Sequence, residues 1–342
     1  MLQGRPYVSN AHFDLAATRN PLYSFDPTAD IAAQKQRMTD KVFELMAPPE
    51  KRTNPEPIIE YVYEGDPRFD EIRFRFESEP GFFMPAHMLL PKGVWKAGGA
   101  KLPTIICLQG HATGMHISIG RPKHEGDQED IDGDRDFCVQ AVRQGYAAVA
   151  LEQRGFGELT GELDKTVSCY APSVQALLLG RTLIGERASD VSRLIDALSC
   201  FDECDTGRVG LMGNSGGGTA TFYTACVEPR IKIAMPSCAF CGLYDSIFSQ
   251  YHCVCNYIPR LYKYFEMGDL ALMIAPRPIV VVCGAKDSSF PLYGVKREFE
   301  TVQKIYAAQG AADKCELVVG PEGHRFYADL GWPVFNRLFA NI

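Results

Sequence analysis

The chain has 342 residues, 46% of them hydrophobic and 23% charged, a composition that supplies a large core and excludes wholesale disorder. Its formal net charge is -7 and its lysines and arginines form no cluster, so we expect no nucleic-acid partner, because phosphate contact needs a basic surface. The sequence shows no export signal and no apolar run that would span a bilayer, so we expect a cytoplasmic protein with no membrane partner. The twelve cysteines fit that compartment, because many of them lie in apolar runs typical of buried positions.

Residues 1–55 are predicted to form an N-terminal helical extension. The segment "TADIAAQKQRMTDKVFELM" has apolar residues at helical spacing, with Thr28 or Asp30 as the N-cap, and the proline-rich "APPEKRTNPEP" ends the helix. From Ile58 the pattern changes to short apolar or alternating runs between turn residues, which predicts three antiparallel strands over 58–65, 71–78 and 82–91. We therefore predict a second unit, a catalytic domain, over residues 56–342.

Beyond residue 104, apolar strands alternate with helical segments. The predicted strands cover 104–110, 146–155, 208–214, 231–240, 277–287 and 315–323, and the predicted helices cover 134–145, 185–201, 217–227, 295–310 and 326–342. Buried strands separated by helices form a mostly parallel sheet with helices on both faces, so the pattern predicts an α/β fold. In such sheets the functional residues lie beyond the carboxyl ends of the strands.

The segment "GNSGG" at 213–217 matches the pattern G-x-S-x-G, which holds a serine on a sharp turn between a strand and a helix. An apolar strand precedes it and a helical segment follows, as that pattern requires. A phosphate-binding loop does not fit, because the segment lacks G-K-[ST] and its glycines do not follow G-x-G-x-x-G. A plain turn remains the alternative to Ser215 as a nucleophile.

A serine nucleophile needs a base and an orienting acid, which in this fold class follow it in the order acid, then histidine. Only two of the seven histidines follow Ser215, and His324 directly follows the last predicted strand whereas His252 follows none. Asp287 ends the predicted strand 277–287, although a turn carboxylate or helix N-cap is its alternative role. Three other acids lie away from strand ends: Asp245, Asp269 and Asp313. The sequence therefore predicts Ser215, Asp287 and His324 as a catalytic triad.

An oxyanion formed at the serine needs two N–H donors, one after the nucleophile and one from the loop after an earlier strand. Gly216 supplies the first by position. In "LQGHATG" the backbone of His111 is the candidate for the second, and a plain turn at Gly110 is the alternative.

Together these segments resemble the α/β-hydrolase superfamily, and more closely its acetyl xylan esterase and dienelactone hydrolase-like branch, related to prolyl oligopeptidase catalytic domains. The resemblance is carried by "CLQGH", "GYAAVALEQRGFGE", "RVGLMGNSGGG", "APRPIVVVCGAKDSSFP" and "GPEGHRF". It implies an eight-stranded, mainly parallel sheet and cofactor-free hydrolysis of a small-molecule ester through an acyl-serine. The residues it implies for those roles are Ser215 as nucleophile, Asp287 as acid, His324 as base, and Gly216 and His111 as oxyanion donors.

Two positions within the resemblance bear on the loops around the site. The "HG" common at the oxyanion loop is Gln109-Gly110 here, which puts side-chain support of that loop in question. Arg154, in "EQRGFGE", is interpreted as an anchor for neighbouring loops rather than a substrate ligand.

Two metal sites were weighed against simpler interpretations. Cys238, Cys241, Cys253 and Cys255, with His252, resemble zinc ligands, but C-x-C is an unusual second half of such a site. We predict instead that 241–266 is a small cap insertion whose aromatic residues line the substrate pocket. The segment "DIDGD" resembles a calcium loop with its glycine misplaced, so we interpret 111–136 as a solvated loop bordering the site and expect no metal.

The sequence therefore favours a serine esterase, with three alternatives. A prolyl oligopeptidase-like peptidase uses the same residues, but the segment before residue 104 is too short for the propeller that such enzymes usually carry. A non-catalytic binding protein of this fold usually lacks a triad member. A metal-dependent enzyme is the third alternative, and the sequence leaves a homo-oligomer open.

Overall fold

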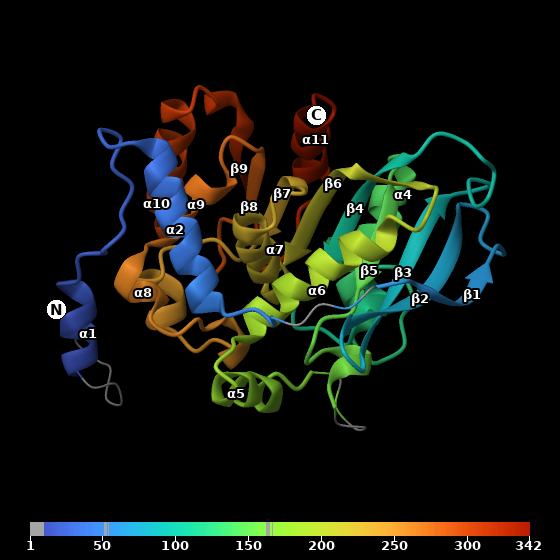
Figure 1. Cartoon of the computed structure of the whole chain (residues 1–342), viewed down its shortest axis with the longest axis horizontal. Coiled ribbons are helices and arrows are strands. Elements are labelled where there is room, and N and C mark those ends of the chain that lie inside the picture. Colours follow the sequence, from blue (N-terminus) through green and yellow to red (C-terminus); the bar gives the residue numbers. More distant parts are fainter. Residues whose placement is uncertain (1–9, 51–52, 54, 162–164, 166) are drawn as a thin grey trace.

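A single mixed sheet forms the centre of the molecule (Figure 1). The computed structural model describes residues 10–50, 53, 55–161, 165 and 167–342, so residues 1–9, 51–52 and 54 of the predicted extension lie outside the described ranges. The strands are β1 (Ile58–Tyr63), β2 (Phe69–Glu79), β3 (Phe82–Pro91), β4 (Leu102–Leu108), β5 (Ala147–Leu151), β6 (Cys204–Asn214), β7 (Ile231–Ser237), β8 (Ile279–Gly284) and β9 (Cys315–Gly320). Their order across the sheet is β1-β2-β3-β5-β4-β6-β7-β8-β9.

The predicted α/β fold is confirmed, and each of the nine predicted strands overlaps one of these strands. Strands β1 to β3 are antiparallel and β3 pairs antiparallel with β5, whereas β5, β4, β6, β7, β8 and β9 are parallel to one another. The resemblance implied eight strands, and the described chain has nine. Strand β1 extends the antiparallel edge, and all six of its residues are exposed.

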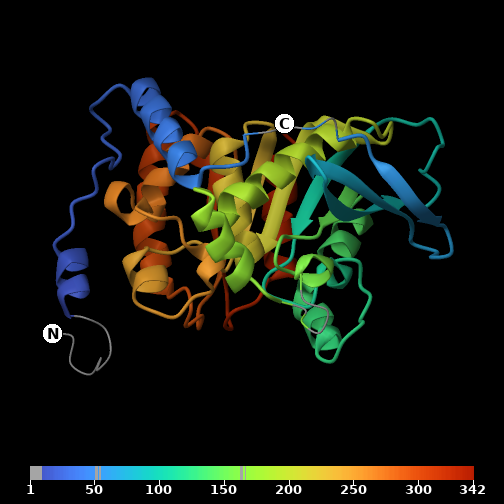
Figure 2. The same cartoon turned by 60° about the horizontal axis from the view of Figure 1, so that its bottom comes forward.

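Helices cover both faces of the sheet, as Figures 1 and 2 show. They are α1 (Asn10–Ala17), α2 (Ile31–Met46), α3 (Asp127–Asp130), α4 (Phe137–Arg143), α5 (Tyr170–Leu178), α6 (Leu183–Leu198), α7 (Gly216–Val227), α8 (Leu261–Tyr264), α9 (Met267–Ile274), α10 (Leu292–Ala308) and α11 (Ala328–Phe339). Helices α2, α6, α7, α9 and α10 share one hydrophobic core with the sheet, and α4 and α11 share a second core with it. None of the described helices is both long and apolar enough to cross a bilayer.

Helix α2 is the predicted helix of the N-terminal segment, and it packs against the main core. Asp30 caps it, because its carboxylate accepts hydrogen bonds from the backbone N–H groups of Ala32 and Ala33. Buried apolar side chains of α2, among them Val42 and Leu45, belong to the same core as the sheet.

Helix α9 shows why the sequence pattern did not predict some of the helices. All eight of its residues are buried, so "MGDLALMI" has no polar face and no helical periodicity to read. Its N-terminus is fixed by a capping box between Glu266 and Asp269.

Candidate active site

Ser215 stands on the turn between β6 and α7 in a strained backbone conformation. Its φ is 56° and its ψ is -122°, a combination that residues other than glycine rarely adopt. Its backbone N–H donates to the Ser237 carbonyl over 2.8 Å. A Cβ on Gly213 would lie 2.6 Å from the carbonyl carbon of Gly217, and a Cβ on Gly217 would lie 2.1 Å from the Leu108 oxygen. The glycines therefore allow β4, β6 and α7 to approach closely enough to hold the turn.

Asp287 and His324 form a direct contact on the loops that follow β8 and β9. The distance between His324 Nδ1 and Asp287 Oδ2 is 2.8 Å, and the carboxylate is fully buried. Its other oxygen accepts the backbone N–H groups of Ser289 at 2.8 Å and Phe290 at 3.1 Å. Burial by itself raises the pKa of Asp287, but the hydrogen bonds from His324 and from the two N–H groups outweigh it and hold the pKa below its usual value.

His324 keeps its second ring nitrogen for another partner. Its side chain is 30% exposed and stacks on the Phe290 ring, with 5.8 Å between ring centroids. Because Nδ1 donates to Asp287, Nε2 is the nitrogen that is able to accept a proton. His252, the other histidine that follows Ser215 in the sequence, packs against the same Phe290 ring, but its Nε2 is 3.0 Å from Ser246 Oγ.

The structure brings the three predicted catalytic residues to one edge of the sheet. Ser215 follows the carboxyl end of β6, and Asp287 and His324 follow those of β8 and β9. Asp287 is not the last residue of β8, as the sequence suggested, but lies three residues beyond the strand's end at Gly284. Such an arrangement of hydroxyl, imidazole and carboxylate is suited to nucleophilic attack on a carbonyl group.

The loop after β4, which carries the predicted oxyanion donor His111, packs tightly against the serine turn that carries the other, Gly216. A Cβ on Gly110 would lie 2.8 Å from the Asn214 oxygen and 3.0 Å from Ser215 Cβ. The His111 ring lies on the other side, 2.8 Å from the position of a Cβ on Gly216. Gly216 begins α7, so its N–H belongs to the first helical turn, where backbone donors have no partner within the helix.

Gln109 gives this loop the side-chain support that the sequence left in question. Its buried Nε2 donates to Ser118 Oγ over 2.7 Å and to the Arg135 carbonyl over 2.8 Å. Gln153, after β5, donates in turn to the Gln109 carbonyl. These bonds fix the loop from both its side chain and its backbone.

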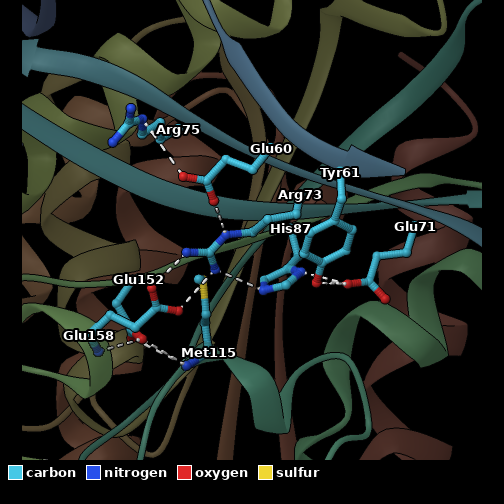
Figure 3. Close-up of polar contacts among 9 residues, drawn as sticks. All are labelled: Glu60, Tyr61, Glu71, Arg73, Arg75, His87, Met115, Glu152 and Glu158. Atoms are coloured by element: carbon cyan, nitrogen blue, oxygen red, sulfur yellow. Dashed lines mark hydrogen bonds and ion pairs between the residues drawn. The ribbon is translucent and has the colours of Figure 1, made fainter. Parts of the chain in front are cut away.

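Glu152 is a supporting residue that the sequence analysis missed. It is buried at the end of β5, and its carboxylate accepts the backbone N–H groups of Met115 at 3.2 Å and Glu158 at 3.3 Å, joining two loops at the edge of the site (Figure 3). Burial raises the pKa of Glu152 to about 7. Nearby, the Arg73 guanidinium donates to both oxygens of Glu158 and lies 2.9 Å from His87 Nε2.

The prediction that 111–136 is a solvated loop is wrong for its first part. Met115 to Ile119 are buried, and His116 Nε2 lies 2.8 Å from the fully buried Asp127 carboxylate. The loop folds inward because this carboxylate also accepts two backbone N–H groups, so its buried charge is satisfied locally. In the calcium-like segment, Asp130 pairs with Arg135 and Asp134 pairs with Arg325, which leaves no cluster of free acids there among the described residues.

The cysteines weighed as one zinc site do not come together. Cys238 lies beside Asp287, and Cys241 donates to the Pro291 carbonyl. Cys253 and Cys255 do lie together, but their neighbours are two residues from elsewhere in the chain, Cys169 and His111. Arg154 is an anchor, as interpreted, because it forms a two-point ion pair with Asp190.

Several aromatic residues of the predicted cap insertion pack against α1 or against one another. Tyr244 and Phe248 pack edge-on against Phe13 of α1, and Tyr262 packs against Phe248. Tyr251 is 97% exposed. Helix α1 thus supplies an apolar partner that the sequence analysis did not foresee, and lining of the substrate pocket by aromatic residues of 241–266 stays a prediction.

Comparison with known proteins agrees with this fold. The chain is 28% identical over 191 residues to the Bacillus subtilis protein named "Putative hydrolase YtaP", covering 55% of this chain and only 62% of that protein. It is 25% identical over 257 residues to a "Putative carboxymethylenebutenolidase" of Methylorubrum extorquens, covering 72% and 69% of the two chains. A solved structure titled as a "putative acetyl xylan esterase" from Bacteroides fragilis superimposes with a TM-score of 0.80 at 17% identity, over 99% of this chain and 97% of that one.

The family model named "X-Pro dipeptidyl-peptidase (S15 family)" matches residues 81–266, more than half of the chain. The match runs from β3 to the end of the segment before α9 and includes the turn that carries Ser215. The sequence match thus includes the serine turn of an α/β-hydrolase fold, and the chain belongs to the S15 family.

Proposed function

We propose that this protein is a serine hydrolase that cleaves a carboxylic ester through an acyl-serine intermediate. The observation that carries the proposal is the hydrogen bond between His324 Nδ1 and the buried Asp287 carboxylate. This pair lies at the same edge of the sheet as Ser215, which stands on a strained turn. A carboxylate in this position fixes the imidazole tautomer that is able to accept the serine proton.

Each residue has a defined step in the proposed reaction. His324 Nε2 takes the proton from Ser215 Oγ as the oxygen attacks the ester carbonyl carbon, and the backbone N–H groups of Gly216 and His111 hold the resulting oxyanion. The protonated His324 then gives its proton to the leaving alcohol, which leaves an acyl-serine. Water deprotonated by His324 attacks this ester, and the acid leaves while the proton returns to Ser215. Asp287 stays ionised throughout and stabilises the imidazolium.

Acetylated carbohydrates and other small esters are the substrates that we propose to test first. The structural neighbour titled as an acetyl xylan esterase supports the first class, and the relative named as a carboxymethylenebutenolidase, whose name denotes a lactone, supports small cyclic esters.

All twelve cysteines are free, which supports a reducing compartment such as the cytoplasm.

Peptide hydrolysis is the second candidate, because the matching family is named for an X-Pro dipeptidyl-peptidase. An amide and an ester are attacked by the same triad, and the difference lies in how the leaving amine is bound and protonated. A substrate panel of acetyl, butyryl and aminoacyl esters together with X-Pro dipeptide amides separates the two activities.

The test of the catalytic assignment is covalent labelling with a fluorophosphonate probe, followed by turnover of the best ester in the panel. We expect the wild-type protein to be labelled, Ser215→Ala to remain unlabelled and its kcat to fall by about 10⁶-fold, the loss seen when a triad serine is removed. Ser199→Ala, at an exposed position after α6, is the matched control and should label like the wild type. Equal labelling of Ser215→Ala, or no labelling of the wild type, would refute the proposal.

A further inference from the structure

Three sulfur atoms and one imidazole nitrogen converge beside the candidate active site. The side chains of His111, Cys169, Cys253 and Cys255 each offer one ligand atom, and the four atoms all lie within 4.8 Å of one another. Within the cluster, His111 Nε2 lies 3.2 Å from Cys255 Sγ. The cluster therefore joins residues that are far apart in the sequence.

The four residues come from three separate segments of the fold. His111 lies on the loop after β4, Cys169 is the N-cap of α5, and Cys253 and Cys255 flank the start of a short 3₁₀ turn, η5 (Val254–Asn256). Cys169 and Cys255 pack in one small hydrophobic cluster, and a ligand bound by all four side chains would join the three segments further.

The donor set and its spacing match a tetrahedral zinc site. Structural zinc is held by four protein ligands, and three cysteines with one histidine is a common set. With Zn–S bonds of about 2.3 Å and Zn–N bonds of about 2.0 Å, the donor atoms of such a site lie about 3.5 to 3.8 Å apart. The spacing observed here requires only small side-chain movements to reach that geometry.

A buried positive charge beside the cluster points to the same ligand. Arg187 is 1% exposed, its Nη2 lies 3.5 Å from Cys169 Sγ, and its Nη1 has no hydrogen-bond partner in the described part of the chain. The guanidinium also donates to the Arg154 carbonyl, but no carboxylate among the described residues forms an ion pair with it, and a buried charge without a counter-charge is strongly destabilising. Three thiolates and a neutral imidazole around a divalent cation leave one net negative charge, which supplies the missing counter-charge.

The surroundings of the cluster are largely apolar. Phe156, Leu183, Cys169 and Cys255 form a small buried hydrophobic cluster, with Val167 and Cys253 partly buried against it. The Arg187 guanidinium lies over the Phe156 ring, 4.5 Å from its centroid. An enclosed site with four protein ligands has no open position for substrate or water, which is typical of structural rather than catalytic zinc.

We propose that His111, Cys169, Cys253 and Cys255 bind a structural zinc ion next to the active site, with Arg187 as the counter-charge. This departs from the expectation that the protein holds no metal, and it uses only two of the five residues weighed in the sequence. Binding releases the thiol protons to solvent as the thiolates coordinate the metal, with no change of oxidation state.

The site would connect metal binding to the oxyanion loop. His111 is the candidate second oxyanion donor through its backbone, and its side chain would be held by the metal. Zinc would thus fix this loop to α5 and to the predicted cap insertion, and its removal would loosen all three segments together. The zinc site itself does not depend on the proposed esterase activity.

The experiment measures metal content and cobalt spectra of the full chain, prepared without an affinity tag and under reducing conditions. After dialysis against zinc and gel filtration, we expect one zinc per chain for the wild type, and at least a tenfold loss in Cys169→Ser and Cys255→Ser. Cys200→Ser, at an exposed cysteine, and Cys241→Ser, at a buried cysteine outside the cluster, are the matched controls and should retain zinc. Replacement of zinc by Co²⁺ in the wild type should give sulfur-to-cobalt charge-transfer bands and the visible bands of a tetrahedral site.

The cobalt spectrum uses the wild-type protein, so it tests the proposal even where a cysteine variant fails to fold. A wild-type chain that takes up neither zinc nor cobalt would overturn the proposal. So would a thiol titration of the denatured chain that finds two thiols missing, because a disulfide within the cluster would remove two of the ligands. Fluorophosphonate labelling of Ser215 in the same preparations reports on the proposed hydrolase activity separately.

Discussion

At the scale of single residues, the site depends on carboxylates whose charge is set by their surroundings. Asp287 is buried but accepts three hydrogen bonds, which lower its pKa and keep it ionised. Glu152 is also buried, yet burial dominates over its backbone hydrogen bonds and raises its pKa to about 7. At about pH 5, between the two pKa values, the two carboxylates therefore differ in charge because they differ in the strength of their partners.

Glu152 should make the stability of the protein depend on pH. The pKa of its carboxyl is about 7 in the folded state and about 4.3 in an unfolded chain, so the folded state holds the extra proton between those values. The free energy of unfolding should therefore fall as pH rises from about 4.3 through 7, by up to about 1.4 kcal/mol per pH unit for this group. In Glu152→Gln, urea unfolding at a series of pH values should show a smaller slope.

Part of the slope should remain in that variant, because burial also raises the pKa of Glu266 to about 7. Glu125→Gln, which removes an exposed carboxylate, is the control and should keep the full wild-type slope. A Glu152→Gln profile parallel to that of the wild type would show that Glu152 is ionised in the folded protein near pH 5.

At the scale of elements, the loop after β4 is shaped by side chains that the motif does not include. Gln109 fixes its start to Ser118 and Arg135, and Glu152 fixes the N–H of Met115. The loop is therefore built from contacts with β5 and with the segment before α4. These contacts support the loop, whose oxyanion role is a proposal, although glutamine stands at the position where histidine is common.

Gln109→Ala should slow catalysis and destabilise the fold. It removes donors to Ser118 Oγ and to the Arg135 carbonyl, and a buried group left without its partner costs about 1–3 kcal/mol. Because the Gly110–His111 backbone would loosen, we expect the rate of fluorophosphonate labelling and kcat to fall about tenfold or more, with a smaller change in KM.

Gln128 lies in the same region, and its side chain donates a hydrogen bond to the exposed Asp132. The variant Gln128→Ala is therefore the control. This control should match the wild type in both measurements. If Gln109→Ala lost stability but kept its labelling rate, the role of Gln109 would be in folding alone.

At the scale of the whole molecule, the N-terminal segment packs as part of the hydrolase core. Figure 1 shows α2 along the same face of the sheet as α6 and α7, with the β1 edge at the far side of the molecule. The buried residues of α2 pack in the core that includes the central strands. We therefore expect residues 31–46 and the sheet to unfold together, although the sequence predicts a boundary near residue 55.

Leu45→Ala tests that expectation. Leu45 is 4% exposed, and truncation of a buried leucine costs about 2–5 kcal/mol. Urea unfolding followed by circular dichroism should show a single transition, at a lower urea concentration than in the wild type. Phe43→Ala, at a side chain 48% exposed on the same helix, should shift it much less. An unchanged main transition in Leu45→Ala would show that α2 folds independently of the sheet.

The sequence by itself determined the order of strands and helices, because strands buried on both faces must be continuously apolar and helices on their faces must be amphipathic. It also predicted that Ser215, Asp287 and His324 lie at one edge of the sheet, since the carboxyl ends of parallel strands meet there. It missed α9, whose burial on every side removes the helical pattern, and it misjudged the loop at 111–119 as solvated.

Only the tertiary structure decided which distant polar groups meet. The contact of Asp287 with His324, the anchoring of Gln109 and the burial of Glu152 depend on loop conformations that leave no periodic pattern in the sequence. The cysteines show this most clearly. Spacing along the chain grouped Cys238 and Cys241 with Cys253 and Cys255, whereas the fold separates the two pairs and brings Cys169 and His111 to the second. Ligand geometry is set by distance in space, and loop segments with no shared strand or helix acquire that distance only when the whole chain has folded.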